Sequence, residues 1–286
     1  MQEEQLGIIG FLLLLVLSAV SLVSLIMLDF SRGVARFRPA MVLAEPKWPG
    51  ATVVVVILTL QAFLIIPGIV MVVLEEAWDT GLDENTNFVI KQTGGMLLGA
   101  GFIVFAVLAW VVGNWKLPLS SFGLRWAPFA NLLPVVLIYV LFIIPLALLG
   151  WFWTQLLKGL GQLVDIQDPV KMFMDAIERG NPLEISLLVF SAVILAPLWE
   201  ELIFRGLLYG YLKSRMSVFA ALLVSSLIFS AYHFNLNALM PLLIVGIATG
   251  YIYERTRSLY FAIFFHALFN ALSMAVLFIL FILAGS

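Results

Sequence analysis

The feature that most constrains this chain is a series of apolar runs, each near the length needed to cross about 30 Å of hydrocarbon. Backbone groups in lipid must be hydrogen-bonded within their own segment, so each run predicts a helix. Only 11% of the 286 residues are charged, against roughly 25% in soluble domains. We therefore predict an all-α fold, a polytopic membrane helix bundle of about eight transmembrane helices, over Leu6–Leu28, Ala51–Leu74, Thr93–Val112, Leu132–Leu156, Ile185–Leu212, Val218–Phe234, Ala238–Tyr253 and Leu259–Leu283.

These runs predict a single membrane domain over residues 1–286, with N-terminal helices and loops in 1–183 and catalytic helices in 184–286. The start, Met-Gln-Glu-Glu-Gln, lacks the basic segment of a signal peptide, so the first run is expected to be retained. The longest polar connection, Val164–Glu184, contains an amphipathic stretch, Val170–Ile177. We expect a solvated loop with one or two helical turns there, rather than a helix lying on the membrane surface.

The distribution of basic residues predicts the orientation. Ten Lys and Arg residues follow the first, third, fifth and seventh predicted helices, and four lie on the other side. By the positive-inside rule, both termini face away from the cytoplasm. We expect a multi-pass integral membrane protein, in the plasma (inner) membrane if the source is bacterial. A net charge of −2 without a basic cluster predicts no nucleic-acid partner.

The most polar stretch inside a predicted span is Ala196–Gly206, which contains Glu200, Glu201 and Arg205. Ionisable groups at membrane depth are costly and usually functional. Glu201 and Arg205 share a helix face at i,i+4, so they are expected to form a supporting ion pair. Glu200 points to another face and has no such partner, which suits a general base. Pro197, one turn earlier, leaves the carbonyl of Val193 without its usual donor.

Both histidines of the chain, His233 and His266, lie in the predicted spans that follow. Phe229 precedes His233 by four residues, so its ring is expected to flank that imidazole, and Asn270 follows His266 at the same spacing. A single buried histidine is more often a core residue than a catalyst. Two histidines near a helix that carries carboxylates favour catalysis instead.

Together these residues predict a hydrolase. Glu200 could deprotonate a water that His233 helps to hold, while His266 and Asn270 stabilise an oxyanion. Alternatively, Glu200, His233 and His266 could bind zinc with one open position. The absence of cysteine excludes a thiol nucleophile and thiolate ligands, but it leaves this choice open. Counted along ideal helices, the three side chains would lie at different depths, about 12 Å for His266, about 18 Å for Glu200 and about 24 Å for His233.

The motifs Glu-Glu-x-x-x-Arg, Phe-x-x-x-His and His-x-x-x-Asn, in this order over about Ile185–Asn270, resemble the CAAX protease and bacteriocin-processing family. The resemblance implies an intramembrane endopeptidase with a cavity open to the cytoplasm and the lipid. Glu200 would be the base, His233 its partner for the water, and His266 with Asn270 the oxyanion site. Glu201 and Arg205 would support them. Members are described both as metalloproteases and as glutamate-dependent proteases, so the resemblance leaves zinc open as well.

The expected partners are membrane lipids and a peptide or lipidated protein substrate, for which a prenylated CAAX terminus is one candidate. Two other classes of protein compete with the enzyme. A proton- or ion-coupled transporter would use intramembrane carboxylates, but it often shows matching broken helices in its two halves. The polar set here is confined to the C-terminal half. A catalytically silent peptide-binding scaffold has no reason to keep an unpaired carboxylate in lipid.

Overall fold

The computed structural model describes residues 46–78, 80–163 and 165–285, and every regular element within these ranges is a helix. The predicted run Leu6–Leu28 lies outside the described residues. The helices are α2 (Thr52–Ala77), α3 (Glu84–Gly95), α4 (Gly101–Trp115), α5 (Leu132–Gly159), α6 (Asp168–Glu178), α7 (Pro182–Phe190), α8 (Ala196–Glu201), α9 (Gly210–Lys213), α10 (Val218–Ala231), α11 (Leu239–Thr256) and α12 (Leu259–Gly285). π-Helical turns join several of them without a break, namely η1 (Met96–Ala100), η4 (Ser191–Leu195) and η5 (Leu202–Tyr209).

The predicted all-α membrane bundle is confirmed. Five helices among the described residues are long and apolar enough to cross a membrane: Thr52–Ala77, Glu84–Trp115, Phe129–Gly159, Pro182–Lys213 and Leu259–Leu283. The other two predicted runs in this part of the chain are helices that fall short of that criterion. α10 has 14 residues, or about 21 Å, and the last turn of α11 is polar.

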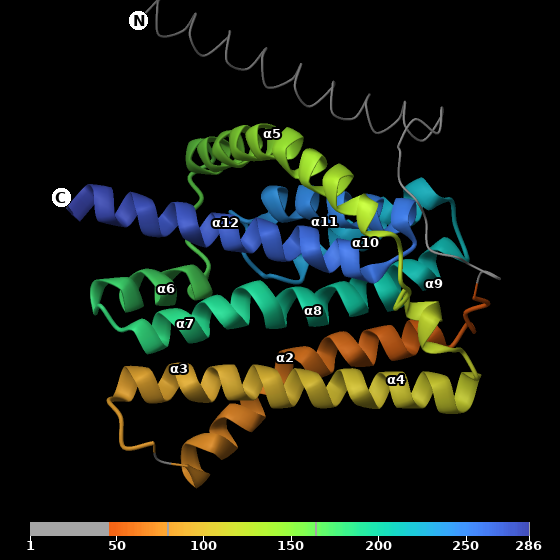
Figure 1. Cartoon of the computed structure of the whole chain (residues 1–286), viewed down its shortest axis with the longest axis horizontal. Helices are drawn as coiled ribbons and strands as arrows, with labels where there is room; N and C mark the ends of the chain where they lie inside the picture. Colours follow the sequence, from red (N-terminus) through yellow and green to blue (C-terminus); the bar gives the residue numbers. More distant parts are fainter. Residues whose placement is uncertain (1–45, 79, 164, 286) are drawn as a thin grey trace, which may run out of the picture.

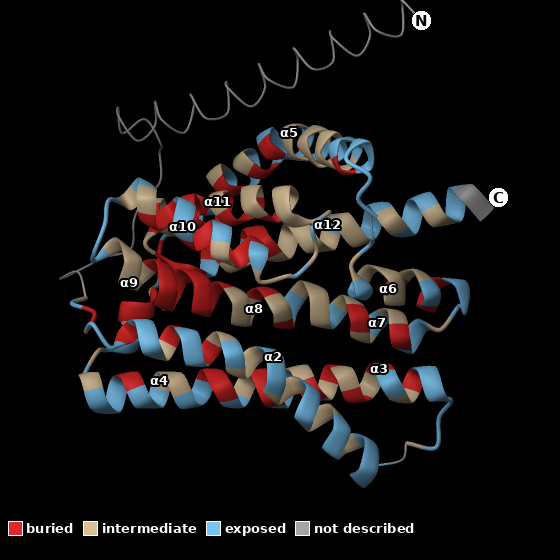
Figure 2. Cartoon of the chain, turned by 180° about the vertical axis from the view of Figure 1, so that it is seen from behind, coloured by how far each residue is buried: buried red, intermediate tan, exposed pale blue. Residues whose placement is uncertain are grey.

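The helix that carries the glutamates lies in the middle of the bundle. In Figure 1, α7, α8 and α9 form one continuous rod, with α2, α3 and α4 on one side of it and α5, α10, α11 and α12 on the other. Figure 2 shows that buried residues are concentrated along this rod and where it meets α10 and α11. All eight residues of η5 are buried. The outer helices α2 and α5 instead expose many apolar side chains, as expected for helices in contact with lipid.

α10 and α11 approach each other closely at Gly246. A Cβ atom on Gly246 would lie 3.0 Å from Cβ of Ser226 and 3.2 Å from Cδ1 of Phe229. A larger side chain there would push α11 away from Phe229 and His233, which the end of α10 positions. The small residue therefore holds the two helices at the separation that the polar site needs.

The expectation of a solvated loop over Val170–Ile177 is wrong. α6 is an 11-residue helix that buries Phe173, Ala176 and Ile177, and these side chains pack with residues of α7 and α12. The loop prediction gave weight to the charged residues, but these occupy the opposite face. On that face, Lys171 donates a hydrogen bond to Asp165, which lies just before α6, and this bond lowers the pKa of the Asp165 carboxyl.

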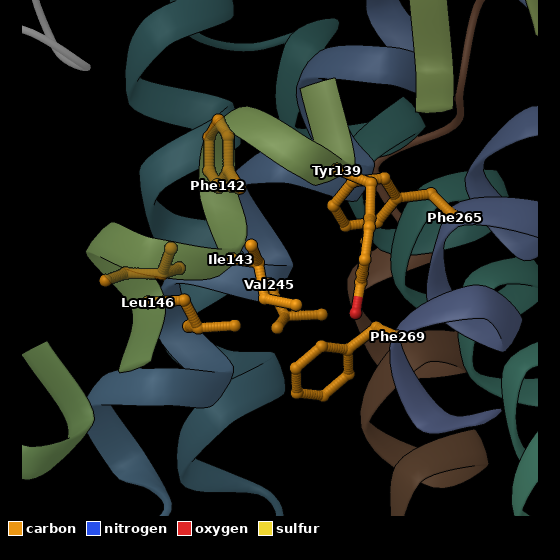
Figure 3. Close-up of a pocket in the computed structure, with 8 residues that line it drawn as sticks. Tyr139, Phe142, Ile143, Leu146, Val245, Phe265 and Phe269 are labelled. Carbon is orange, nitrogen blue, oxygen red and sulfur yellow. The ribbon is translucent and has the colours of Figure 1, made fainter. Parts of the chain in front are cut away.

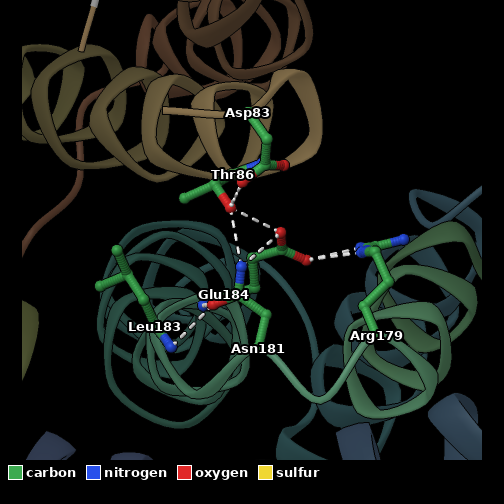
Figure 4. Close-up of polar contacts among 6 residues, drawn as sticks. All are labelled: Asp83, Thr86, Arg179, Asn181, Leu183 and Glu184. Atoms are coloured by element: carbon green, nitrogen blue, oxygen red, sulfur yellow. Dashed lines mark hydrogen bonds and ion pairs between the residues drawn. The ribbon is translucent and has the colours of Figure 1, made fainter. Parts of the chain in front are cut away.

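A buried polar cluster joins α3 to the start of α7 (Figure 4). The side chain of Glu184 is fully buried. Its Oε1 accepts a hydrogen bond from Nδ2 of Asn181 at 3.0 Å and lies 2.8 Å from Oγ1 of Thr86, and its Oε2 accepts from Nε of Arg179 at 3.1 Å and Nη2 at 2.5 Å. Asn181 also caps α7, and Asp83 caps α3. Both carboxylate oxygens of Glu184 are thus satisfied, and the cluster fixes the central rod against the N-terminal helices.

Candidate active site

The backbone that presents the two glutamates departs from α-helical pairing just before them. At the end of η4, the Ala196 amide donates to the Ser191 carbonyl, five residues earlier. The next donor in this register would be Pro197, which has no N–H, so its acceptor, the carbonyl of Ala192, needs another partner. Nδ2 of Asn270 supplies it at 2.7 Å. The sequence predicted that Pro197 leaves the carbonyl of Val193 without a donor. The carbonyl without a backbone donor is instead that of Ala192, one residue earlier, because hydrogen bonds in the π-turn span five residues and not four.

The predicted pair of Glu201 and Arg205 is present. Nε of Arg205 lies 3.1 Å from Oε2 of Glu201, and both side chains are fully buried. Arg205 also donates to the hydroxyl of Thr249, at 3.0 Å from Nε and 2.6 Å from Nη2. The Thr249 hydroxyl in turn donates to the carbonyl of Gly246 at 3.2 Å. The buried guanidinium is thus held between α8 and α11.

Glu201 has a second partner that orients His266. Its Oε1 lies 2.9 Å from Nδ1 of His266. An ionised carboxylate only accepts hydrogen bonds, so Nδ1 carries the proton. In the neutral ring, Nε2 is then the unprotonated nitrogen. Through this contact Glu201 sets both the tautomer and the direction of the imidazole, much as carboxylates orient histidines in other catalytic sites.

His233 is oriented in the same way by the backbone. It lies on the turn that follows α10, and its Nδ1 is 2.9 Å from the carbonyl oxygen of Phe229. A carbonyl can only accept, so Nδ1 is again the protonated nitrogen and Nε2 is free to accept. Both imidazoles therefore present Nε2 away from their anchoring contacts.

Glu200 lies between these two nitrogens. Its Oε2 is 3.8 Å from Nε2 of His233 and 3.8 Å from Nε2 of His266. These separations exceed a direct hydrogen bond, and this buried oxygen has no hydrogen-bond partner among the described residues. The side chain as a whole is 24% exposed and that of His233 is 21% exposed, so the group of three reaches the surface. A carboxylate oxygen thus meets two imidazole nitrogens, with no Lys or Arg paired to it among the described residues.

The ring of Phe229 packs against both histidines and against Arg205. Its ring centroid lies 4.9 Å from that of His233 and 5.8 Å from that of His266, both edge to face. Cζ of Arg205 lies 4.9 Å from the same ring. Six of the seven residues singled out in the sequence are therefore in contact at one place. The seventh, Asn270, is bonded instead to the carbonyl of Ala192 on the central rod. The three different depths expected from ideal helices do not hold, because Oε2 of Glu200 lies 3.8 Å from Nε2 of both histidines.

Two residues of this region escaped the sequence analysis. Thr249 is fully buried and receives two donors of Arg205, and Tyr232 donates to the carbonyl of Leu60 at 2.7 Å, which ties the end of α10 to α2. Thr249 is one of few polar residues in the middle of α11, and this position was the one feature of the sequence that could have pointed to its role. Neither contact follows from spacing along one helix.

The zinc alternative stays a prediction. In a tetrahedral site with bonds of about 2.0–2.1 Å, ligand atoms lie about 3.4 Å apart, whereas Oε2 of Glu200 is 3.8 Å from each imidazole nitrogen. Among the described residues, no group of three or more His, Cys, Asp or Glu side chains is arranged to hold a metal ion. We derive no step through a metal.

An apolar pocket lies beside the site. It opens between α5, α11 and α12 (Figure 3) and is lined by aromatic and aliphatic side chains, among them Tyr139, Phe142, Val245, Phe265 and Phe269. Phe265 and Phe269 directly precede His266 and Asn270 on α12. Glu200 itself does not line this pocket. Successive helix residues point about 100° apart, so the pocket lies on a different face of α12 from His266 and Asn270.

Comparison with known proteins covers the same part of the chain. The family profile described as type II CAAX prenyl endopeptidase Rce1-like matches residues 182–272. The resemblance inferred from the motifs is confirmed. A Bacillus subtilis (strain 168) protein named "Putative membrane peptidase YdiL" is 33% identical over 86 residues, which cover 30% of this chain and 35% of that relative. The chain thus matches about a third of the length of this curated relative, and no solved structure matches.

The segment matched by the CAAX endopeptidase profile contains every residue of the candidate site. It begins at the capped start of α7 and extends just past Asn270 on α12. The helices that precede it, α2 to α6, lie outside the match. Of these, α2 to α4 lie on one side of the central rod and α5 lies on the other, and Glu184 connects the rod to α3.

Proposed function

We propose that this chain is an intramembrane endopeptidase in which Glu200 activates a water molecule. The observation that carries the proposal is the position of Glu200 Oε2, without a hydrogen bond and 3.8 Å from Nε2 of both His233 and His266. Polar groups at such a separation are suited to a bridging water. The proposed substrate is a peptide bond near the terminus of a membrane-anchored or membrane-associated chain.

The orientation of His233 explains how the water would be held. Its Nδ1–H donates to the Phe229 carbonyl, so Nε2 can accept one O–H of the water while Glu200 accepts the other. The lone pair of the water oxygen is then free to attack a carbonyl carbon. As the C–O bond forms, Glu200 takes the proton, and it returns the proton to the nitrogen when the C–N bond breaks.

His266 is placed to stabilise the oxyanion. In its protonated form, Nε2 becomes a donor, and the contact between Nδ1 and Glu201 stabilises that positive charge. Asn270 uses one N–H on the Ala192 carbonyl, which fixes the amide while its second N–H remains as a donor. In this account Glu201, Arg205 and Phe229 position the catalytic groups and do not react.

The membrane setting fits a substrate that is itself in the membrane. The chain is an integral membrane protein with five apolar spans in its described part. The family description and the name of the relative both support a membrane peptidase, and the former supports a CAAX-type terminus. From the positive-inside rule, we infer that the site is reached from the cytoplasmic side of the membrane.

Cleavage assays with purified protein test this proposal. The full chain in lipid nanodiscs would be given a fluorogenic peptide that ends in a CAAX sequence, with and without a prenyl group, and with and without a strong chelator. We expect cleavage that the chelator does not reduce, and faster cleavage of the prenylated peptide. Loss of activity in chelator with recovery on adding zinc would contradict the metal-free mechanism. Absence of cleavage of either peptide by folded protein would contradict the CAAX-type substrate.

A further inference from the structure

His233 lies in the short connection between α10 and α11, residues 232–238, and not in a regular helix. The amides of His233 and Phe234 donate to carbonyls three residues earlier, at 3.3 Å and 3.1 Å. Phe234 then has φ +49°, a left-handed conformation that is rare for a large side chain. Such a conformation costs free energy and persists where surrounding contacts hold it. The contacts of this connection with other helices therefore decide where His233 lies.

Tyr232 anchors the near end of this connection to α2. Its hydroxyl donates to the carbonyl of Leu60 at 2.7 Å. Its ring packs edge to face against Phe204 of η5, with the ring centroids 5.8 Å apart. A carbonyl oxygen has two lone pairs, so that of Leu60 can accept from the hydroxyl as well as from its own helix. The residue directly before His233 is thus held by one hydrogen bond and one ring contact.

Two hydrogen bonds from α5 anchor the far end of the connection. The indole N–H of Trp153 donates to the carbonyl of Leu236 at 2.7 Å. Oγ1 of Thr154 donates to Oδ1 of Asn237, also at 2.7 Å. Because the two donors are adjacent on α5 and the two acceptors are adjacent in the connection, this end is held at two points.

The partners of these bonds lie outside the segment that the CAAX endopeptidase profile matches. That segment covers residues 182–272, and it includes Tyr232 and the rest of the connection. Leu60, Trp153 and Thr154 all precede it. A helix that only covered the central rod would need no polar bond to this connection, and α2 and α5 otherwise expose many apolar side chains. The bonds therefore indicate that these two helices help to shape the catalytic site.

We propose that α2 and α5 complete the site by positioning His233, through the hydrogen bonds that Tyr232 and Trp153 make. This inference rests on the proposed peptidase function, in which Nε2 of His233 and Oε2 of Glu200, 3.8 Å apart, share a water. Without these bonds, Phe234 could leave its left-handed conformation and the imidazole would turn. The water would then lose one of its two acceptors. Tyr232 and Trp153 are thus positioning residues that do not touch the reacting atoms.

Nitrogen-15 NMR of the full chain in lipid bilayers tests the position of His233 without any use of peptidase activity. Tyr232→Phe removes the hydroxyl and keeps the ring. At a pH where the imidazole is neutral, we expect this variant to lose part of the Nδ1–H form of His233, with the signals of His266 unchanged. Trp153→Phe should act on His233 in the same way from α5. Tyr260→Phe is the matched control, because its side chain is 46% exposed and its hydroxyl has no hydrogen-bond partner among the described residues.

Cleavage kinetics, expressed per folded molecule, provide the second measurement. Tyr232→Phe and Trp153→Phe should each lower kcat about five-fold, which corresponds to a hydrogen bond worth about 1 kcal/mol. KM should stay the same, because no group that binds the substrate is removed. Unchanged His233 signals in both variants, an unaltered kcat in both, or an equal change in Tyr260→Phe would overturn the proposal. If the unaltered chain cleaves no peptide, the peptidase function is wrong, and the His233 signals alone decide whether α2 and α5 position this residue.

Discussion

The structure places two glutamates of one continuous helix in opposite electrostatic situations. Glu184, at the start of α7, is fully buried, and both its carboxylate oxygens accept hydrogen bonds, two of them from Arg179. Glu200, sixteen residues later, has an oxygen with no partner among the described residues, between two imidazoles at 3.8 Å. A satisfied carboxylate stabilises the fold, whereas an unsatisfied one costs stability and is available to react.

Glu201 shows that the difference arises from position and not from residue type. It is the direct neighbour of Glu200, yet it is fully buried, and its Oε2 forms an ion pair with Arg205 while its Oε1 contacts Nδ1 of His266. Oε2 has no hydrogen-bond partner among the described residues, so the ion pair is what distinguishes this carboxylate from Glu200. The two side chains leave the helix in different directions, so one meets a cation and the other does not. The comparison therefore yields a ranking: the more deeply buried the cation that a carboxylate neutralises, the more the loss of that carboxylate should destabilise the protein and the less it should act as a base.

The largest expected loss of stability follows Glu201→Ala. This change removes the carboxylate that neutralises the fully buried guanidinium of Arg205, whose hydrogen-bond partner among the described residues is Thr249. Breaking a buried ion pair from one side costs about 3–5 kcal/mol. Thermal unfolding in detergent should show a large fall in melting temperature. If the melting temperature stays unchanged, the ion pair does not stabilise the fold, and Glu201 does not rank first in its effect on stability.

Glu184→Gln should come second. The amide cannot accept from all of its present donors, so the cluster of Figure 4 loses satisfied hydrogen bonds, at a cost of about 2 kcal/mol. The cost stays below that of Glu201 because the Arg179 side chain is 36% exposed and can turn to water. Urea or thermal unfolding measures the change. Glu178→Gln, on the exposed face of α6, is the control and should leave stability unaltered.

Thr249→Val should have a smaller effect on stability and a specific effect on His266. The variant removes the acceptor of two Arg205 donors, at a cost of about 1–2 kcal/mol. Arg205 would then be free to shift relative to Glu201, which orients the imidazole. The chain has two histidines, so ¹⁵N NMR can follow the tautomer of His266. A loss of the Nδ1–H form in Thr249→Val that Thr249→Ser restores would support this link, and identical spectra for all three proteins would refute it.

The N-terminal cap of α3, where Asp83 is hydrogen-bonded to Thr86, gives a test with a smaller, pH-dependent effect. The hydrogen bond from the Thr86 hydroxyl, together with its backbone amide, lowers the pKa of Asp83 below its usual 3.8. A depressed pKa in the folded state means that the ionised cap stabilises at neutral pH, and that this stability is lost as the pH falls below about 3.8. In Thr86→Val, the pKa of Asp83 should rise toward its ordinary value. Carboxyl ¹³C NMR titration measures it, and an unchanged value would show that Thr86 does not stabilise the charge.

The smallest expected effect on stability is that of Glu200→Gln. The carboxylate has no cation to lose, so the free energy of unfolding should change by no more than about 0.5 kcal/mol. A fall comparable to that of Glu201→Ala would show that Glu200 is a structural residue. The two neighbouring glutamates would then not differ as the structure indicates.

Contacts within one helix could be predicted from the sequence. The i,i+4 spacing predicted the pairing of Glu201 with Arg205, because helix geometry brings these side chains together. It also predicted the contact between Phe229 and His233, although His233 lies on the turn that follows α10. The apolar runs predicted the helices for the same reason. Only length and hydropathy are needed to recognise a span.

Contacts between helices could not be predicted. The bond from Asn270 to Ala192 depends on a π-turn that shifts the pairing by one residue, and the bond from Arg205 to Thr249 depends on how α8 and α11 lie against each other. Glu184 was predicted only as the end of the polar connection Val164–Glu184, and nothing in the sequence indicated its buried partners. The same limit explains the depths expected for the three catalytic candidates, which assumed straight helices with level ends.

Peptidase activity of Glu200→Gln tests the central claim most directly. The measurement is the rate of cleavage of the CAAX-type peptide in nanodiscs, per folded molecule, for Glu200→Gln, Glu184→Gln and the unaltered chain. If Glu200 is the base, its variant should lose activity by about 10²- to 10⁴-fold while its melting temperature stays the same. The Glu184 variant should keep its rate per folded molecule. Full activity in a folded Glu200→Gln protein would contradict the account.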